Sequence, residues 1–130
     1  MTMAKILLID DDRAFTGFLA DYIRENYPLL QMEACNSSIS ALQSIKTGGY
    51  DFLLIDLEMP TMDGLKVLDF AIQAGVDKNR IAILSGRDAD FLHKLCPMGT
   101  CLAVLNKFEA RQKVVLDMIF SSLHKKAGGT

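Results

Sequence analysis

Charged side chains follow directly after three short apolar runs of this chain. They are Asp10, Asp11 and Asp12 after the run 6–9, Asp56 after the run 52–55, and Lys107, with Asn106 before it, after the run 102–105. Carboxylate oxygens are the ligands that hard divalent cations such as Mg²⁺ prefer. A carboxylate can also attack phosphorus when a metal ion and an ammonium group neutralise the developing charge. If the runs are adjacent parallel strands, these residue types predict a site for a divalent cation and a phosphoryl group.

Apolar patterning predicts five strands that alternate with five helices. The expected strands cover about 6–9, 30–34, 51–56, 80–84 and 101–105. The expected helices cover about 13–26, a segment capped by Ser37 or Ser38 and closed by Gly48, the segment from Gly64 to Gly75, and about 88–95 and 109–125. The helix at 88–95 has the weakest pattern, because Pro97 and Gly99 follow it closely.

This alternation predicts an α/β fold of the (βα)5, flavodoxin-like class. Five strands that alternate with helices pair in parallel through right-handed crossovers, with helices on both faces of the sheet. The expected strand order is 2-1-3-4-5, in which the first and third strands are neighbours at the switch point. Ligands of such sheets bind outside the carboxyl ends of the strands, where the acids, Ser85 and Lys107 are expected to meet.

Composition limits the other classes of function. The 130 residues suit one domain, and 14 Lys plus Arg against 16 Asp plus Glu give no basic surface for nucleic acid or anionic membranes. Three cysteines without a C-x-x-C pair favour a reducing, cytoplasmic compartment. A strand is expected to begin within the first five residues, so we expect no signal sequence, and no apolar stretch approaches the ~20 residues of a membrane span.

The segment 56–64 carries the most specific motif. Its sequence, Asp-Leu-Glu-Met-Pro-Thr-Met-Asp-Gly, resembles the phospho-acceptor loop D-x-x-M-P-x-M-D-G of response regulator receiver domains in two-component systems. The opening run that ends in the acidic triplet resembles the first strand and acidic pocket of that family. The resemblance covers about 4–125 and divides the chain into a receiver domain at 1–125 and a tail or linker start at 126–130.

The resemblance implies a phosphorylation switch rather than a turnover enzyme. Asp56 would accept a phosphoryl group from a phosphohistidine of a sensor histidine kinase or a histidine phosphotransfer protein. Asp10, Asp11, Asp56 and the backbone carbonyl of Glu58 would hold Mg²⁺, with Asp10 acting through water. Ser85 and Lys107 match the switch hydroxyl and the lysine that contact the product. Asp12 is expected to cap the first helix, and Met59 and Met62 to plug the loop against the fold.

Departures from the family pattern concern the output side of the site. Phe108 replaces the usual proline after the lysine, which makes a cis peptide bond there costly by about 3 kcal/mol. Val104 stands where an aromatic side chain commonly reports phosphorylation. Glu58 and Arg87 lie two residues after Asp56 and Ser85, and we expect them to form an ion pair that shields the site from water.

Other functions fit the residues less well. A phosphatase resembling the haloacid dehalogenase superfamily would use Asp10 and Asp12, but Ala14 and the short chain do not match it. A receiver-like interaction module that is not phosphorylated is the main alternative. Flavin binding disagrees with the acidic first loop. The resemblance implies a downstream effector protein or domain, and it allows a homodimer through the segments 88–95, 101–105 and 109–125.

Overall fold

The computed structural model of the chain describes residues 3–60 and 63–129. Five strands form one parallel sheet: β1 (Ala4–Ile9), β2 (Leu30–Cys35), β3 (Phe52–Asp56), β4 (Ile81–Ser85) and β5 (Ala103–Asn106). Five α-helices connect and follow them: α1 (Arg13–Asn26), α2 (Ser38–Thr47), α3 (Gly64–Gln73), α4 (Ala89–Leu95) and α5 (Ala110–Lys126). A short 3-10 turn, η1 (Lys78–Arg80), precedes β4. The predicted alternation is confirmed.

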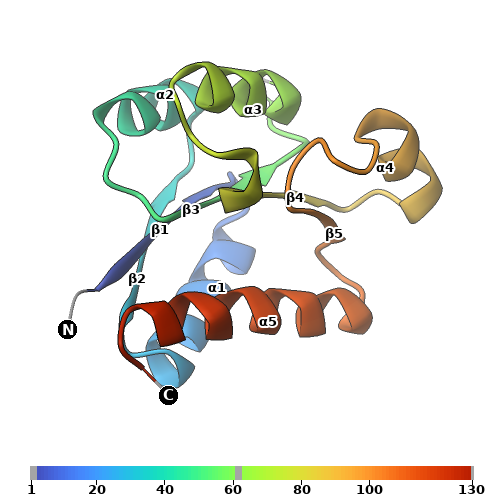
Figure 1. Cartoon of the computed structure of the whole chain (residues 1–130). Helices are drawn as coiled ribbons and strands as arrows, with labels where there is room; N and C mark the ends of the chain where they lie inside the picture. Colours follow the sequence, from blue (N-terminus) through green and yellow to red (C-terminus); the bar gives the residue numbers. More distant parts are fainter. Residues whose placement is uncertain (1–2, 61–62, 130) are drawn as a thin grey trace.

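The strand order is β2-β1-β3-β4-β5, as predicted. Helices α1 and α5 cover one face of the sheet, whereas α2 and α3 cover the other (Figure 1). The three central strands are apolar on both faces, because side chains alternate between the two helical layers. Register sets the site, since Ile9 on β1 lies opposite Ile55 on β3. The next residues, Asp10 and Asp56, therefore leave the sheet side by side.

Local capping fixes where several helices begin. Asp12 and Ser37 cap α1 and α2, each with a side-chain oxygen that accepts a backbone N–H three residues later. The expected capping role of Asp12 is thus confirmed, and Ser37 rather than Ser38 caps α2. Asp63 caps α3, and Gly64 is buried so closely against Asp56 and Leu57 that a Cβ would lie 2.4 Å from the Asp56 carbonyl oxygen. Gly64 therefore lets α3 start directly under the site.

Burial differs from the expected helix faces at several positions. The 3.6-residue period places Met118 on the apolar stripe of α5 and Ile39 on that of α2, but their exposed fractions are 67% and 68%. Phe120, which is fully buried, anchors α5 instead. The 3.6-residue period identifies a stripe only to within one neighbouring position, and packing chooses between the neighbours. Strand β5 begins at Ala103 rather than 101, and α5 runs one residue beyond the expected boundary at 125.

No helix within the described ranges combines the length and the apolar character that crossing a membrane would require.

Candidate functional site

Asp10, Asp11 and Asp56 converge at the carboxyl-terminal edge of the sheet. One carboxylate oxygen of each lies within 4.8 Å of the others. Asp10 and Asp56 are only 1% and 3% exposed, whereas Asp11 faces solvent. The backbone supports this arrangement, because the Asp10 N–H donates to the Cys35 carbonyl of β2 at 2.9 Å. The structure therefore brings the predicted acids together at one partly open spot.

Lys107 reaches these acids from the loop after β5. Its backbone N–H donates to the Ser85 carbonyl at 2.9 Å, which ties the β5 end to the β4 end. Its ammonium nitrogen lies 2.6 Å from Asp10 Oδ2 and 3.5 Å from Asp56 Oδ2, and the side chain is 6% exposed. The aromatic ring of Phe15 lies beside the same ammonium, 4.9 Å from ring centre to nitrogen. A buried cation is thus held between two buried anions.

Burial and charge set the protonation of this cluster. Burial, together with repulsion from Asp10, raises the pKa of Asp56 to about 7, although the Lys107 charge and the Glu58 N–H oppose the shift. For Lys107, burial alone would lower the pKa, but contact with Asp10 and the charge of Asp56 outweigh it, so the pKa is raised. Lys107 therefore stays protonated, while Asp56 needs further positive charge to be fully ionised at neutral pH.

The Ser85 hydroxyl donates its hydrogen bond to Glu58. Ser85 Oγ lies 2.6 Å from Glu58 Oε2 and 2.8 Å from Oε1. The N–H of Gly86 donates to Glu58 Oε1 at 3.1 Å. Glu58 in turn donates its backbone N–H to Asp56 Oδ1 at 3.1 Å. The sequence assigned Glu58 only a backbone role and an ion pair, so its side-chain contact with Ser85 was missed.

The expected ion pair between Glu58 and Arg87 is wrong. The Glu58 carboxylate is engaged by Ser85 and Gly86, and none of the ion pairs found among the described residues joins it to Arg87. The Arg87 guanidinium instead lies over the Phe91 ring of α4, 3.9 Å from its centre. The neighbouring Ser85 hydroxyl is the closer donor, and stacking on an aromatic ring leaves the guanidinium hydrated.

Asn106 has a connecting role that sequence analysis did not assign. Its amide nitrogen donates to the Arg87 carbonyl at 2.9 Å, and its amide oxygen accepts the N–H of Phe108 at 2.8 Å. An asparagine between an apolar strand and the site lysine is the only sequence signal for this bridge. The Phe108 side chain is 74% exposed, and one of its ring carbons would lie 3.1 Å from a Cβ at Gly86. The Lys107–Phe108 peptide bond is trans.

Two residues of the acceptor loop, Thr61 and Met62, lie outside the described residues. Met59 is 9% exposed and packs against the layer under α3, as expected for a plug. One carboxylate oxygen of Asp12 accepts a hydrogen bond from the N–H of Phe15 at 3.1 Å. This capping bond gives Asp12 a structural role at the start of α1.

The donor set fits a hard divalent cation. Three carboxylates with oxygens in mutual reach are the ligands that Mg²⁺ takes, and the ion usually keeps several waters beside one or two carboxylates. The exposed Asp11 leaves one side of the cluster open to water. The raised pKa of Asp56 points the same way, since a bound cation would favour its charged form.

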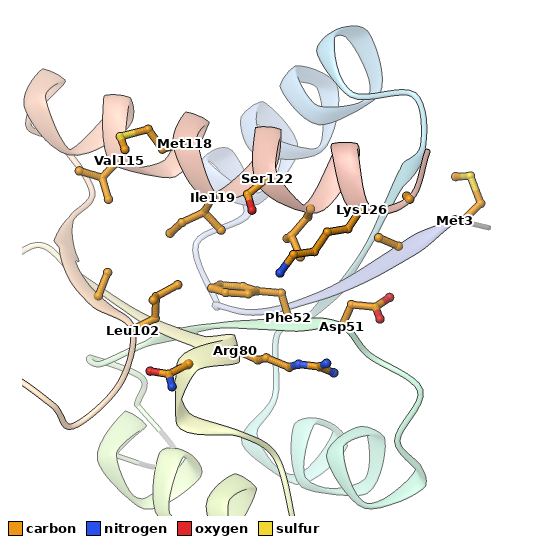
Figure 2. A pocket seen from close by; sticks show the side chains of 15 residues that line it. Met3, Asp51, Phe52, Arg80, Leu102, Val115, Met118, Ile119, Ser122 and Lys126 are labelled. Atoms are coloured by element: carbon orange, nitrogen blue, oxygen red, sulfur yellow. The ribbon is translucent and has the colours of Figure 1, made fainter. Parts of the chain in front are cut away.

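A cavity of about 510 Å³ lies at the opposite, amino-terminal edge of the sheet. Figure 2 shows its walls, with side chains of α5 such as Ile119 facing Phe52 across the gap and Lys126 reaching over it. Within the described residues, the carboxylate cluster lies at the other end of β1 and β3. This cavity therefore does not coincide with the carboxylate cluster.

Comparisons with known proteins agree with the geometry. The family model of the response regulator receiver domain matches residues 6–119. The probable C4-dicarboxylate response regulator DctR of Priestia megaterium is 26% identical over 113 residues, which are 86% of this chain and 50% of that protein. This chain thus spans half the length of that relative.

Solved structures share the fold. The receiver domain of the Francisella response regulator 1452 is 24% identical with a TM-score of 0.75, over 95% of this chain and 98% of that one. The response regulator TrrA of Thermotoga maritima, solved with Mg²⁺ and BeF, is 20% identical with a TM-score of 0.74, over 93% of this chain and 99% of that one. The family match over most of the chain, with the fold and the acidic site, shows that this chain belongs to the response regulator receiver domain family.

Proposed function

We propose that this receiver domain accepts a phosphoryl group on Asp56 in a Mg²⁺-dependent reaction and signals through the conformation that follows. The observation that carries the proposal is the Lys107 ammonium, held 2.6 Å from Asp10 and 3.5 Å from Asp56 within a cluster of three carboxylates. Such a cluster combines an anionic nucleophile with the positive charge that phosphoryl transfer needs.

Asp10, Asp11 and Asp56 would hold the ion, with the backbone carbonyl of Glu58 as a further protein ligand. Asp10 would act through water, because one of its oxygens is already paired with Lys107. Bound Mg²⁺ would neutralise charge on the phosphoryl oxygens and favour the ionised form of Asp56.

Each side chain then has a defined task in the transfer. An oxygen of Asp56 forms the new O–P bond while the N–P bond of a phosphohistidine breaks, and the leaving imidazole takes up a proton. The Lys107 ammonium pairs with one phosphoryl oxygen, and the Ser85 hydroxyl donates a hydrogen bond to another. The donor is a sensor histidine kinase or a histidine phosphotransfer protein. The protein therefore acts as a phosphorylated switch rather than as an enzyme that turns over a substrate.

Intact-protein mass spectrometry with acetyl phosphate tests the proposal. With Mg²⁺, the wild type should gain one phosphoryl mass, and Asp56→Ala should gain none, because the proposed acceptor carboxylate has been removed. Asp69→Ala removes an exposed aspartate from α3 and serves as the matched control, which should gain the same mass as the wild type.

Chelation of Mg²⁺ should abolish the gain in every variant. A phosphoryl mass on Asp56→Ala would contradict the assignment of the acceptor. No mass on a folded wild type in the presence of Mg²⁺ would favour the interaction module instead. Repeated turnover of a phosphate ester that depends on Asp10 would favour the phosphatase.

We propose that a set of individually exposed apolar side chains around α4, β5 and α5 forms the output surface. Its side chains come from α4 and α5, from the loops flanking β5 and from the loop after Lys107, and they are Leu95, Met98, Leu102, Phe108, Val114 and Met118. Phe108 and Asn106 connect this surface to the loop that holds Ser85. We propose that a downstream effector or a second copy of the chain binds here.

Three free thiols support a cytoplasmic location, since this compartment keeps cysteines reduced.

A further inference from the structure

The Glu58 carboxylate occupies two hydrogen-bond donors beside the acceptor aspartate. Its oxygens take the Ser85 hydroxyl at 2.6 and 2.8 Å and the Gly86 N–H at 3.1 Å. Ser85 is 0% exposed, so its hydroxyl has little access to water as an alternative partner. One carboxylate thus satisfies a buried side-chain donor and a backbone donor at the end of β4.

A phosphoryl group on Asp56 would need the same donors. Glu58 is two residues from Asp56, and its own N–H already holds the Asp56 carboxylate, at 3.1 Å from Oδ1. A hydroxyl carries one proton and a backbone N–H carries one, so neither can serve two anionic acceptors at full strength. The Glu58 side chain and a phosphoryl group on Asp56 therefore compete for Ser85 and Gly86.

We propose that, in the unphosphorylated state, the Glu58 carboxylate occupies the hydrogen-bond donors that the phosphoryl group would need. In that state Glu58 accepts the hydrogen bonds of the Ser85 hydroxyl and the Gly86 N–H, and it must release both on phosphorylation. The inference rests on the proposed phosphorylation of Asp56 and adds the residue that opposes it. Bonds from a hydroxyl and an amide to an ionised carboxylate are charge-assisted, so this competitor is strong.

Release of the Glu58 carboxylate would also change the output surface at Phe108. Gly86 lies against the exposed Phe108 ring, and the adjacent Arg87 carbonyl accepts the Asn106 amide. When Gly86 turns its N–H toward the phosphoryl group, the Phe108 ring loses its packing position. The competition at Glu58 therefore couples the site to the loop after Lys107, where Val104 offers no aromatic switch.

Binding of the phosphoryl analogue beryllofluoride, with Mg²⁺, measures the competition without turnover. A ligand that needs released donors binds more weakly in proportion to the fraction in which they are free. Titration followed by the ¹H–¹⁵N signal of Gly86 should give an apparent Kd that is about three- to tenfold lower in Glu58→Gln and Glu58→Ala than in the wild type. The Gly86 signal of each free variant should also shift, because its acceptor has changed.

Glu109→Gln is the matched control, since it removes the same charge from an exposed residue that makes no side-chain capping bond at the start of α5. Its Kd should equal that of the wild type. Ser85→Ala separates competition from simple repulsion. The increase in beryllofluoride affinity caused by Glu58→Gln should be smaller in the Ser85→Ala background, because one of the two shared donors is gone. Charge repulsion alone would leave that increase unchanged.

Equal Kd values for the wild type and both Glu58 variants would overturn the inference, as would an unchanged increase in affinity in the Ser85→Ala background. Absence of beryllofluoride binding in every variant, including the wild type, would instead contradict the proposed function.

Discussion

The carboxyl-terminal edge of the sheet gathers buried charges, whereas the amino-terminal edge holds a mostly apolar cavity. At the first edge, Lys107 is 6% exposed and paired with two buried aspartates. At the second edge, Phe52 and Ile119 line a space of about 510 Å³, and Lys126 reaches over it without an ion pair among the described residues. The same strands, β1 and β3, begin at one edge and end at the other (Figure 1).

The contrast shows which property marks function in this fold. The cavity lies beside α5, and among the described residues the one group of acids that could hold a metal ion is not in its lining. The charged edge instead holds a buried lysine 2.6 Å and 3.5 Å from two buried aspartates, and burying such charges costs folding energy. The two edges should therefore respond differently to substitution, to pH and to divalent cations.

Phe52→Ala should have the largest effect on stability. Phe52 is 3% exposed beside the cavity, so its removal enlarges an existing void and should cost about 4 kcal/mol of unfolding free energy. Urea unfolding at pH 5 and pH 8 should give the same loss, because no charge changes. The folded fraction should still gain a phosphoryl mass on Asp56. Loss of that modification in folded protein would show that the two edges are not independent.

Lys107→Met should cost about 3 kcal/mol at pH 8 without divalent cations, because two buried carboxylates lose their counter-charge. The loss should be smaller at pH 5, where Asp56 can take up a proton. Urea unfolding at the two pH values is again the measurement. A loss that does not change with pH would mean that Lys107 contributes through packing on Phe15 rather than through its charge.

Asp56→Asn should stabilise the protein at pH 8 in the absence of divalent cations. Burial and the charge of Asp10 raise the pKa of Asp56 in the folded protein to about 7, from an ordinary value of 3.8. The wild type therefore loses stability as the pH rises from about 4 to 7, because its unfolded state gives up a proton that the folded state keeps, and the variant does not. The two should be equally stable near pH 3.5. Equal stability at pH 8 as well would show that burial and the charge of Asp10 do not raise the pKa of Asp56.

Lys126→Met should have the smallest effect, within about 0.5 kcal/mol at either pH, because an exposed lysine without an ion pair contributes little. It is the partner experiment to Lys107→Met at the opposite edge. A loss comparable to that of Lys107→Met in urea unfolding would mean that the charge above the cavity also stabilises the fold.

Much of this molecule could be predicted from its sequence. Short apolar runs, Pro and Gly breaks, and capping residues such as Asp12 and Ser37 gave five strands and five helices in the observed order. The convergence of Asp10, Asp56 and Lys107 followed from strand order alone. Helix faces were less predictable, since Met118 lies on the periodic stripe of α5 and yet faces solvent. Packing against the curved sheet decides such positions.

The Glu58 side chain marks the limit of prediction from sequence. Opposite charge alone predicts an ion pair between Glu58 and Arg87. In the structure the Glu58 carboxylate accepts hydrogen bonds from the Ser85 hydroxyl and the Gly86 N–H instead. Every residue except proline has a backbone N–H, so the sequence does not show which one will bind a carboxylate. The contact of Arg87 with the Phe91 ring depends on the position of α4, which is a property of the tertiary structure.

Sequence by itself determined the elements, their order and the identity of the acids and the lysine, because periodicity and residue type are local properties. The tertiary structure decided what those groups face: which aspartate pairs with Lys107, which anion holds Ser85, and which edge of the sheet is empty. Orientation and burial depend on neighbours that are far apart in the chain, and only folding brings them within a few ångströms of one another.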